Sequence, residues 1–282
     1  MRGSLPGSEK KSVALTTDDT QDESGMLFDK MFTCPVCDTE FSVKQVRSGK
    51  LISGGKDGDL RPRFKNIDVM KYRVMQCPVC AYADIEPFFG LISRRETEAL
   101  KENPAPKNEL LTHAEGVRSY EMAYRHYKAA MRSGMIRRAK CSVRATTALY
   151  TAWLIRGWRK HRESLGETVE DNEPMSKSEE YKHLKHAVNN YSEAAVSEDF
   201  PLAGMDDATF DYLMSVLYYE IGDISNCGKY LLEAMRNKAL KGNLRRGAEN
   251  LKELLRKNAG KKEEKETREE PEKKEKRFLD LF

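Results

Sequence analysis

Apolar residues recur every three or four positions through most of the chain beyond residue 93, and this spacing predicts amphipathic helices. Ser93 and Glu96 form the sequence signature of a capping box at the start of this region. The proline-containing stretch 103–106 should end the first helical run, and Ser133-Gly134 should form a turn. The helices expected beyond that stretch lie near 108–132, 135–161, 178–197, 206–221, 224–239 and 242–258.

The segment before residue 91 carries a different pattern. Met70, Tyr72 and Val74 alternate with charged residues, and a period of two predicts a half-buried strand. Ser53–Asp59 contains three glycines and predicts an exposed, mobile loop. The expected fold class is therefore mainly α with a small β ribbon, in which the ribbon precedes the helices.

Composition divides the chain into four parts. Residues 1–25 are rich in small and polar residues and predict a disordered arm. Residues 26–90 should form the ribbon, and residues 91–259 the helical domain. Residues 260–282 are almost entirely Lys, Arg and Glu before an apolar tip, which is typical of a disordered charged tail.

Composition also excludes several classes of protein. The chain has 282 residues, 33% of them charged, and its formal net charge of +4 is too small to indicate a partner by itself. Its apolar stretches are too short to span a membrane, and residues 1–25 lack the apolar core of a signal peptide. The six cysteines favour a reducing compartment over a disulfide scaffold. We therefore expect a cytoplasmic protein with no membrane partner.

Two identical Cys-Pro-Val-Cys units carry the clearest chemistry in the chain. Each unit places two thiolates on a tight turn, and two such turns complete the four-sulfur shell that zinc prefers in structural sites. All four positions would then be filled by the protein, so the zinc would be structural, with no open position for water or substrate. The expected ligands are Cys34, Cys37, Cys77 and Cys80.

Two other uses of these cysteines remain open from the residues alone. Rubredoxin-type iron sites also use Cys-Pro-x-Cys, and a single Cys-x-x-Cys can be a redox pair, although a redox pair needs no second copy. Colour distinguishes the metals, because a purified iron protein would be red. Asp38 and Ala81 follow the second cysteine of each unit, where glycine is usual, so we expect some strain in both turns.

Residues 206–240 resemble one tetratricopeptide unit, with Gly222-Asp223 at the turn between its two helices. Ser215 stands where glycine is usual, and Cys227 stands where alanine is usual. Helical hairpins of this kind would offer a groove to a protein or peptide. The alternative is an ordinary bundle of packed helices, and under either reading Cys141 and Cys227 fill core space.

Charge is distributed unevenly along the helices. Residues 118–162 carry twelve Lys and Arg against Glu121 alone, whereas residues 163–220 are mainly acidic. A basic helix can bind phosphate backbones, helped here by a basic ribbon loop, and nucleic-acid binding is therefore the alternative function. The other explanation is that basic and acidic helices face each other inside the fold. The basic residues of the loop are Arg47, Lys50, Lys56, Arg61, Arg63 and Lys65.

No catalytic constellation is recognisable in the sequence, so we expect no enzyme. His183 and His186 lie three positions apart on a predicted helix, but no Glu-x-x-His frame surrounds them. The chain also shows no phosphate-binding loop and no dinucleotide fingerprint.

The apolar tip of the tail has no core to enter locally. Leu279, Leu281 and Phe282 resemble the end of the short peptide by which bacterial replication and repair proteins dock onto the sliding DNA clamp. Phe278 occupies the place where that peptide usually has glutamine. Equal recovery of the clamp by chains with and without residues 278–282 would exclude this partner.

Several stretches together match one known layout. In the ribbon they are Cys34–Cys37, Phe41, Val46–Ser48, Arg61-Pro62 and Cys77–Ala83. In the helices they are Ala152–Leu154, Met205-Asp206, Leu217-Tyr218 and Gly222-Asp223. Over roughly residues 28–258 the chain thereby resembles the domain-of-unknown-function 2225 family of uncharacterised bacterial proteins. The resemblance implies a bacterial cytoplasmic protein with a metal ribbon and repeat-like helices, and it implies no activity.

These observations lead to one functional hypothesis. We expect a non-enzymatic adaptor, with a structural zinc ribbon followed by tetratricopeptide-like helical hairpins that bind a protein or peptide partner. The alternative is a nucleic-acid-binding protein that uses the basic helix and the ribbon loop. Steep weakening of binding with salt would identify backbone contacts, whereas failure to retard any DNA or RNA at low salt would eliminate this alternative.

Overall fold

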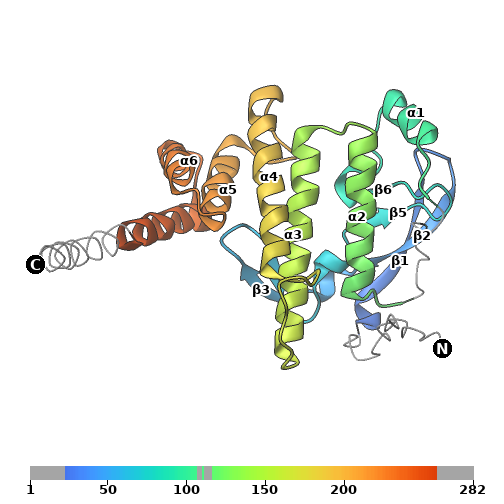
Figure 1. The fold of residues 1–282 in the computed structure, drawn as a ribbon, viewed down its shortest axis with the longest axis horizontal. Helices are drawn as coiled ribbons and strands as arrows, with labels where there is room; N and C mark the ends of the chain where they lie inside the picture. Colours follow the sequence, from blue (N-terminus) through green and yellow to red (C-terminus); the bar gives the residue numbers. More distant parts are fainter. Residues whose placement is uncertain (1–22, 107–109, 111–115, 259–282) are drawn as a thin grey trace, which may run out of the picture.

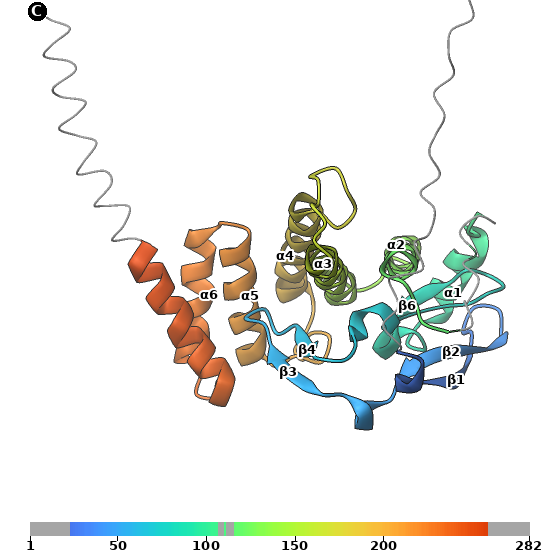
Figure 2. The ribbon, with the colours of Figure 1, turned by 90° about the horizontal axis from the view of Figure 1, so that it is seen from below.

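The computed structural model describes residues 23–106, 110 and 116–258 of the chain. The helices lie side by side in chain order, and the strands run along one side of this helical layer (Figures 1 and 2). A mainly helical chain with small two-stranded sheets and clustered cysteines near its N-terminus confirms the expected fold class. The predicted arm lies largely outside the described residues, as do the charged tail and its tip at Leu279, Leu281 and Phe282.

The strands form three separate antiparallel hairpins, because each pairs with its neighbour in the chain. The pairs are β1 (Leu27–Thr33) with β2 (Glu40–Val46), β3 (Ser53–Lys56) with β4 (Pro62–Phe64), and β5 (Val74–Gln76) with β6 (Ala83–Ile85). Short 3-10 helices connect or flank them: η1 (Ser24–Met26), η2 (Ser48–Lys50), η3 (Val69–Tyr72) and η4 (Glu86–Phe88).

The helices are α1 (Arg94–Glu102), α2 (Tyr120–Ile136), α3 (Cys141–Ser164), α4 (Lys177–Ser197), α5 (Asp207–Glu220), α6 (Ile224–Arg236) and a last helix over residues 242–258. The capping box predicted at Ser93 and Glu96 is present at the start of α1. Side-chain caps at Ser119, Ser176 and Asp206 begin later helices in the same way. In the part of the chain that the structure describes, no helix combines the length and apolarity needed to cross a bilayer.

The turn predicted at Ser133-Gly134 is wrong, because α2 continues to Ile136. Both residues are buried, and the Ser133 hydroxyl accepts a hydrogen bond of 3.2 Å from the backbone N–H of Ala83 in the ribbon. This tertiary contact stabilises the helical conformation of two residues that locally favour a turn. The helix expected over 108–132 correspondingly begins at Tyr120, after the cap at Ser119.

One hydrophobic core joins the ribbon to the helices. Leu27, Val74 and Ile85 of the hairpins belong to the same buried cluster as Tyr127 of α2 and Leu154 of α3. A second cluster lies around the cysteines, and a third joins α5, α6 and residues 242–258. Cys227 is buried in the third cluster, as expected of a core residue, whereas Cys141 is only half-buried in the first turn of α3.

The half-buried strand predicted from Met70, Tyr72 and Val74 is wrong in two respects. Residues 69–72 form η3, and all three of these apolar side chains are buried. Lys71, expected on an exposed face, is also buried and pairs with Glu23 at 2.7 Å. The segment lies between a hairpin and the helices, so both of its faces are covered and its burial does not follow a period of two.

The loop predicted over Ser53–Asp59 is wrong in part: most of the segment is exposed, as predicted, but it contains regular structure. Ser53–Lys56 is strand β3, and Asp59 is fully buried. The carbonyl of Gly58 accepts a hydrogen bond of 2.9 Å from the Tyr212 hydroxyl of α5. This segment therefore reaches from the ribbon across to the helices, and β3 and β4 lie beside α5 in Figure 2.

Candidate metal centre

Both cysteine units lie at the closed ends of hairpins. Thr33 pairs with Glu40 at the end of β1 and β2, and Gln76 pairs with Ala83 at the end of β5 and β6. Each pair encloses six residues, so the two turns have the same length and present their cysteines at the same positions. The long segment between the hairpins allows two distant parts of the sequence to form one site.

The two turns repeat the same backbone hydrogen bonds. In the first, the Cys34 N–H donates to the Thr39 carbonyl at 2.9 Å, and the Asp38 N–H donates back to the Cys34 carbonyl at 2.9 Å. The equivalent bonds in the second turn join Cys77 to Tyr82 at 2.8 Å and Ala81 to Cys77 at 3.0 Å. This closed pattern of hydrogen bonds restrains the backbone of each Cys-x-x-Cys unit.

Each turn also contains a residue in the left-handed region. Asp38 has φ 59° and Ala81 has φ 60°, conformations that glycine adopts without steric cost. These are the positions at which the sequence predicts strain, and the structure confirms the prediction. A strained residue of this kind persists when surrounding contacts determine its conformation, and the paired hydrogen bonds supply part of that restraint.

The structure brings the four cysteine sulfurs together. Cys34 Sγ lies 3.6 Å from Cys80 Sγ, Cys37 Sγ lies 3.5 Å from Cys77 Sγ, and all four sulfurs lie within 4.8 Å of one another. A tetrahedron with metal–sulfur bonds of about 2.3 Å has edges of about 3.8 Å, close to these separations. The four side chains could therefore hold one metal ion.

Backbone amides add positive potential around the sulfurs. The Val36 N–H points to Cys34 Sγ at 3.4 Å, and the Val79 N–H points to Cys77 Sγ at 3.5 Å. Hydrogen bonding from Cys34 lowers the pKa of Cys77, while the same neighbour raises the pKa of Cys80. A bound cation would favour the thiolate form of both cysteines, because a coordinating thiol gives up its proton.

A small aromatic core supports the sulfur cluster. The ring of Phe89 packs 5.0 Å from Tyr82 and 5.9 Å from Phe41, measured between ring centroids. Cys34 and Cys77 are fully buried beside these rings, whereas Cys37 and Cys80 are partly exposed. Two sulfurs thus face the protein and two lie nearer to solvent, which leaves a route by which an ion could enter.

Arg137 attaches this region to the helices. Its guanidinium donates to Asp84 of β6 at 2.6 Å and to Glu96 of α1 at 2.5 Å, and its side chain is buried. Removal from solvent disfavours the charged form of the buried Asp84 carboxyl and raises its pKa, an effect that the Arg137 charge opposes. The arginine therefore fixes β6 relative to α1 and α2.

Several of the predicted basic residues have carboxylate partners inside the molecule. Arg156 of α3 donates to Glu180 of α4 at 2.5 Å and to Glu220 of α5 at 3.0 Å. Arg159 also pairs with Glu180, and Arg144 lies 3.7 Å from Glu193. Basic and acidic segments thus face each other across α3, α4 and α5.

The ribbon loop shows the same pairing. Arg61 donates to Asp68 at 2.9 Å, and Arg63 Nε lies 3.1 Å from Asp57. Arg118, the first residue of the predicted basic segment, is buried and donates to backbone carbonyls of Lys71 and Val74. Fewer of these cations are available for an external phosphate backbone than the sequence indicates.

Of the two histidines singled out in the sequence, His186 is exposed and His183 packs between helices. His183 lies edge-on to Tyr124, with 6.5 Å between the ring centroids, and its Nε2 lies 3.5 Å from Glu179. Burial lowers the pKa of His183 to about 4, so this imidazole is neutral near pH 7. Its neighbour Glu179 accepts from the Tyr124 hydroxyl, which accounts for the arrangement as helix packing between α2 and α4.

Comparison with known protein families identifies one whose model matches most of the chain. Residues 27–259 match the model of a family described as "Uncharacterized protein conserved in bacteria (DUF2225)". No curated protein and no solved structure matches the chain. The matched region spans both cysteine hairpins and the helices, so the family model covers the ribbon and the helical layer as one unit.

Proposed function

The chain belongs to this bacterial family of uncharacterised proteins, and we propose that it is a zinc-stabilised, non-enzymatic adaptor that binds a basic peptide segment of a protein partner. Two parts of the structure support the proposal. The sulfur cluster supplies a structural metal site, and the hairpin of α5 and α6 supplies a surface for a partner.

Zinc is the metal that the donor set favours. Four thiolates on two tight turns fill a tetrahedral shell, which is the usual composition of a structural zinc site. A filled shell has no open position for substrate, so the ion would act on stability. By joining β1–β2 to β5–β6 it would hold together a small ribbon whose own aromatic core is limited.

The partner surface is an aromatic strip in which the partly exposed Phe200, Tyr218 and Tyr230 pack around the buried Phe210. Tyr218 of α5 and Tyr230 of α6 stack with 5.4 Å between ring centroids, and Phe210 connects them to Phe200. Phe200 is 44% exposed, and both tyrosines are partly exposed. Partly exposed, mutually packed aromatic side chains are typical of binding surfaces, because they bury large area at little entropic cost.

The acidic residues near the strip indicate the charge of the partner. Burial, together with the neighbouring charges of Asp207 and Glu233, raises the pKa of Asp211 to about 6. Near pH 7 Asp211 is therefore mostly ionised in a negatively charged neighbourhood. A peptide with Lys or Arg beside an apolar residue would relieve this repulsion and could place its cation over a tyrosine ring.

The helical hairpin itself is consistent with the tetratricopeptide likeness. Gly222 has φ 82° at the turn, and Ser215, Cys227 and Ala234 are fully buried where α5 and α6 pack. Small side chains at these positions let two helices approach closely. The adaptor proposal rests on the aromatic strip alone. Close helix packing occurs in any helical bundle and therefore does not indicate a partner.

A peptide-display selection on the purified full-length chain tests the proposal. Enriched peptides should combine basic and apolar residues, and Tyr230→Ala should weaken their binding at least about tenfold in fluorescence polarisation. Tyr181→Ala is the matched control, because Tyr181 is an exposed tyrosine on α4 outside the strip. Peptides that bind both variants equally, or a selection without enrichment, would refute the strip as a binding surface.

Nucleic-acid binding remains a second candidate with weaker support. The proposal needs cations that can displace the counterions of a phosphate backbone, and Arg137, Arg156 and Arg159 already pair with carboxylates. Mobility-shift titration of DNA and RNA at low salt distinguishes the candidates. Retardation that falls steeply with added salt would favour nucleic acid over the adaptor.

A further inference from the structure

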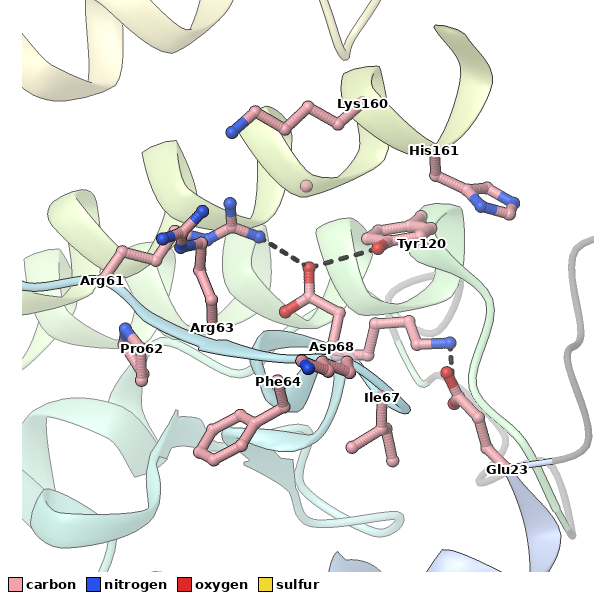
Figure 3. A pocket seen from close by; sticks show the side chains of 13 residues that line it. Glu23, Arg61, Pro62, Arg63, Phe64, Ile67, Asp68, Tyr120, Lys160 and His161 are labelled. Carbon is pink, nitrogen blue, oxygen red and sulfur yellow. Dashed lines mark hydrogen bonds and ion pairs between the residues drawn. The ribbon is translucent and has the colours of Figure 1, made fainter. Parts of the chain in front are cut away.

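A cavity of about 350 Å³ opens between the segment that follows β4 and helix α3 (Figure 3). Its lining comes from segments distant in the sequence, including the chain at Arg61–Lys65, Tyr120 at the start of α2, and Lys160 of α3. The volume lies at the lower end of the range for small-molecule sites. It suits a compact ligand better than a folded partner.

Gly157 makes the floor of this cavity possible. A Cβ atom at this position would lie 2.1 Å from Asp68 Oδ2 and 2.6 Å from Arg61 Nη2. The absence of a side chain in the middle of α3 therefore allows the Arg61–Asp68 pair to pack directly on the helix. Asp68 also accepts from the Tyr120 hydroxyl at 3.1 Å, so the floor is held by a fixed set of hydrogen bonds (Figure 3).

The cavity carries excess positive charge. Its lining contains three more Lys and Arg side chains than carboxylates. The Lys71–Glu23 pair at 2.7 Å and the Arg61–Asp68 pair account for both carboxylates of the lining. The remaining cations are Arg63, Lys65 and Lys160.

The exposure and pairing of the basic side chains show which of them can donate to a ligand. Lys65 and Lys160 are exposed and form no ion pair within the described residues, and Arg63 is half exposed although it pairs with Asp57. Arg61 has a side chain that is 8% exposed, and its buried Nε has no hydrogen-bond partner in the described part of the chain. Lys65, Lys160 and the exposed part of Arg63 can therefore donate to a bound anion, and hydrogen bonds between charged donors and an anionic oxygen are the strong ones.

The rest of the lining is apolar or aromatic. Pro62, Phe64 and Ile67 lie on one side, and Tyr120 packs 5.5 Å from the ring of His161. A ligand that joined an anionic group to a small flat or apolar body would use both halves of this surface. A phosphate monoester has this form, and its charge approaches −2 near neutral pH.

We propose that this cavity binds a small phosphate monoester, with its phosphate held by Arg63 and Lys160 and its organic part against Tyr120. The cavity is independent of the aromatic strip, because none of its lining residues belongs to α4, α5 or α6. Failure of the adaptor proposal would therefore leave this proposal standing, and the reverse also holds.

Titration calorimetry of the full chain with phenyl phosphate tests the proposal. Saturable binding with one site per chain is expected, and phenyl sulfate, with the same shape and one charge less, should bind about tenfold more weakly. Lys160→Glu should weaken phenyl phosphate binding at least about tenfold, because it reverses an exposed charge at the rim. Lys185→Glu, at an exposed lysine of α4 that does not line the cavity, should change binding less than about twofold.

Three outcomes would overturn the proposal. The first is the absence of saturable heat with phenyl phosphate at low salt. The second is binding that Lys160→Glu and Lys185→Glu affect equally, since this would place the anion elsewhere on a basic surface. The third is equal affinity for phenyl phosphate and phenyl sulfate, which would indicate unselective anion binding. Both lysines are exposed, so urea unfolding midpoints close to that of the unmodified chain establish that the variants are folded.

Discussion

Asp59 is the residue whose replacement tests the packing of the ribbon on the helices most sharply. It is fully buried, and one of its carboxylate oxygens accepts from Trp153 Nε1 at 2.7 Å and from Arg156 Nη1 at 2.8 Å. The other oxygen accepts from the backbone N–H of Arg61 at 3.3 Å. Asp59→Ala removes the acceptor from all three donors at once.

The expected loss of stability follows from these contacts. A buried donor left without an acceptor costs about 1–3 kcal/mol, and removal of one partner from a buried ion pair costs about 3–5 kcal/mol. Arg156 keeps Glu180 and Glu220 as partners, so its charge remains compensated. We therefore expect Asp59→Ala to lower the free energy of unfolding by about 3 kcal/mol, and Asp59→Asn by about 1–2 kcal/mol.

Urea unfolding monitored by tryptophan fluorescence provides the assay, with Asp29→Ala as the control. The Asp29 side chain is 62% exposed and pairs with Lys44 at 2.8 Å on the outside of the ribbon. Exposed pairs of this kind contribute less than about 1 kcal/mol. The reasoning is refuted if Asp59→Ala costs no more than Asp29→Ala at an unchanged dependence on urea.

Three further changes test other parts of the structure. Arg118→Met should lower the free energy of unfolding in urea by about 2–4 kcal/mol, because two buried carbonyls lose their donor. The control Arg94→Met replaces a side chain that is 93% exposed and should have almost no effect. Gly157→Ala should lower the free energy of unfolding by about 1–3 kcal/mol in the same assay, although alanine has the better helix propensity, because the Arg61–Asp68 pair must move. A variant as stable as the unmodified chain, or more stable, would contradict the close approach of this pair to α3. The pKa of Asp211 is raised to about 6 in the folded state, so the folded chain binds this proton more tightly than the unfolded chain, and the contribution of Asp211 to stability falls as pH rises through 6. Asp211→Asn should therefore raise the thermal midpoint at pH 8 relative to the unmodified chain and leave it unchanged at pH 4; an equal shift at both values would contradict the assignment.

The cysteine turns were predictable because their determinants are local. Four consecutive residues, Cys-Pro-Val-Cys, specify each turn. The strain expected at Asp38 and Ala81 follows from the left-handed conformation that the turn requires. The helices near 178–197, 206–221, 224–239 and 242–258 are also placed to within a few residues, because clear caps and glycine turns mark their ends.

The segment between the hairpins was not predictable from local pattern. Ser53–Asp59 has the composition of an exposed loop, and only the arrival of Trp153 and Arg156, far along the chain, makes burial of Asp59 favourable. Gly157 was missed for the same reason, since a lone glycine in a helical pattern gives no indication of what lies against it. A buried ion pair depends on tertiary structure, and its members look like ordinary surface residues in the sequence.

The surplus of basic residues in 118–162 illustrates the same difficulty in the functional interpretation. In the sequence these residues are compatible with a phosphate-binding face or with pairing to the acidic helices, and in the structure Arg137 and Arg156 pair with carboxylates of α1, α4, α5 and the ribbon. Lys160 and the basic residues around Arg61 line one small cavity, where positive charge is concentrated. Charge along a sequence therefore indicates a partner only once the internal pairs are known.

The central claim is that sulfurs from two hairpins bind a single zinc ion and thereby hold the ribbon together. Two measurements on protein produced in zinc- and iron-replete medium test this claim: elemental analysis, and X-ray absorption spectroscopy at the edge of the bound metal. We expect about one zinc per chain with four sulfur neighbours at about 2.3 Å, and loss of both the metal and the ribbon's stability in Cys34→Ser. Iron in place of zinc, a shell with fewer than four sulfurs, or a metal-free chain that unfolds at the same urea concentration would contradict it.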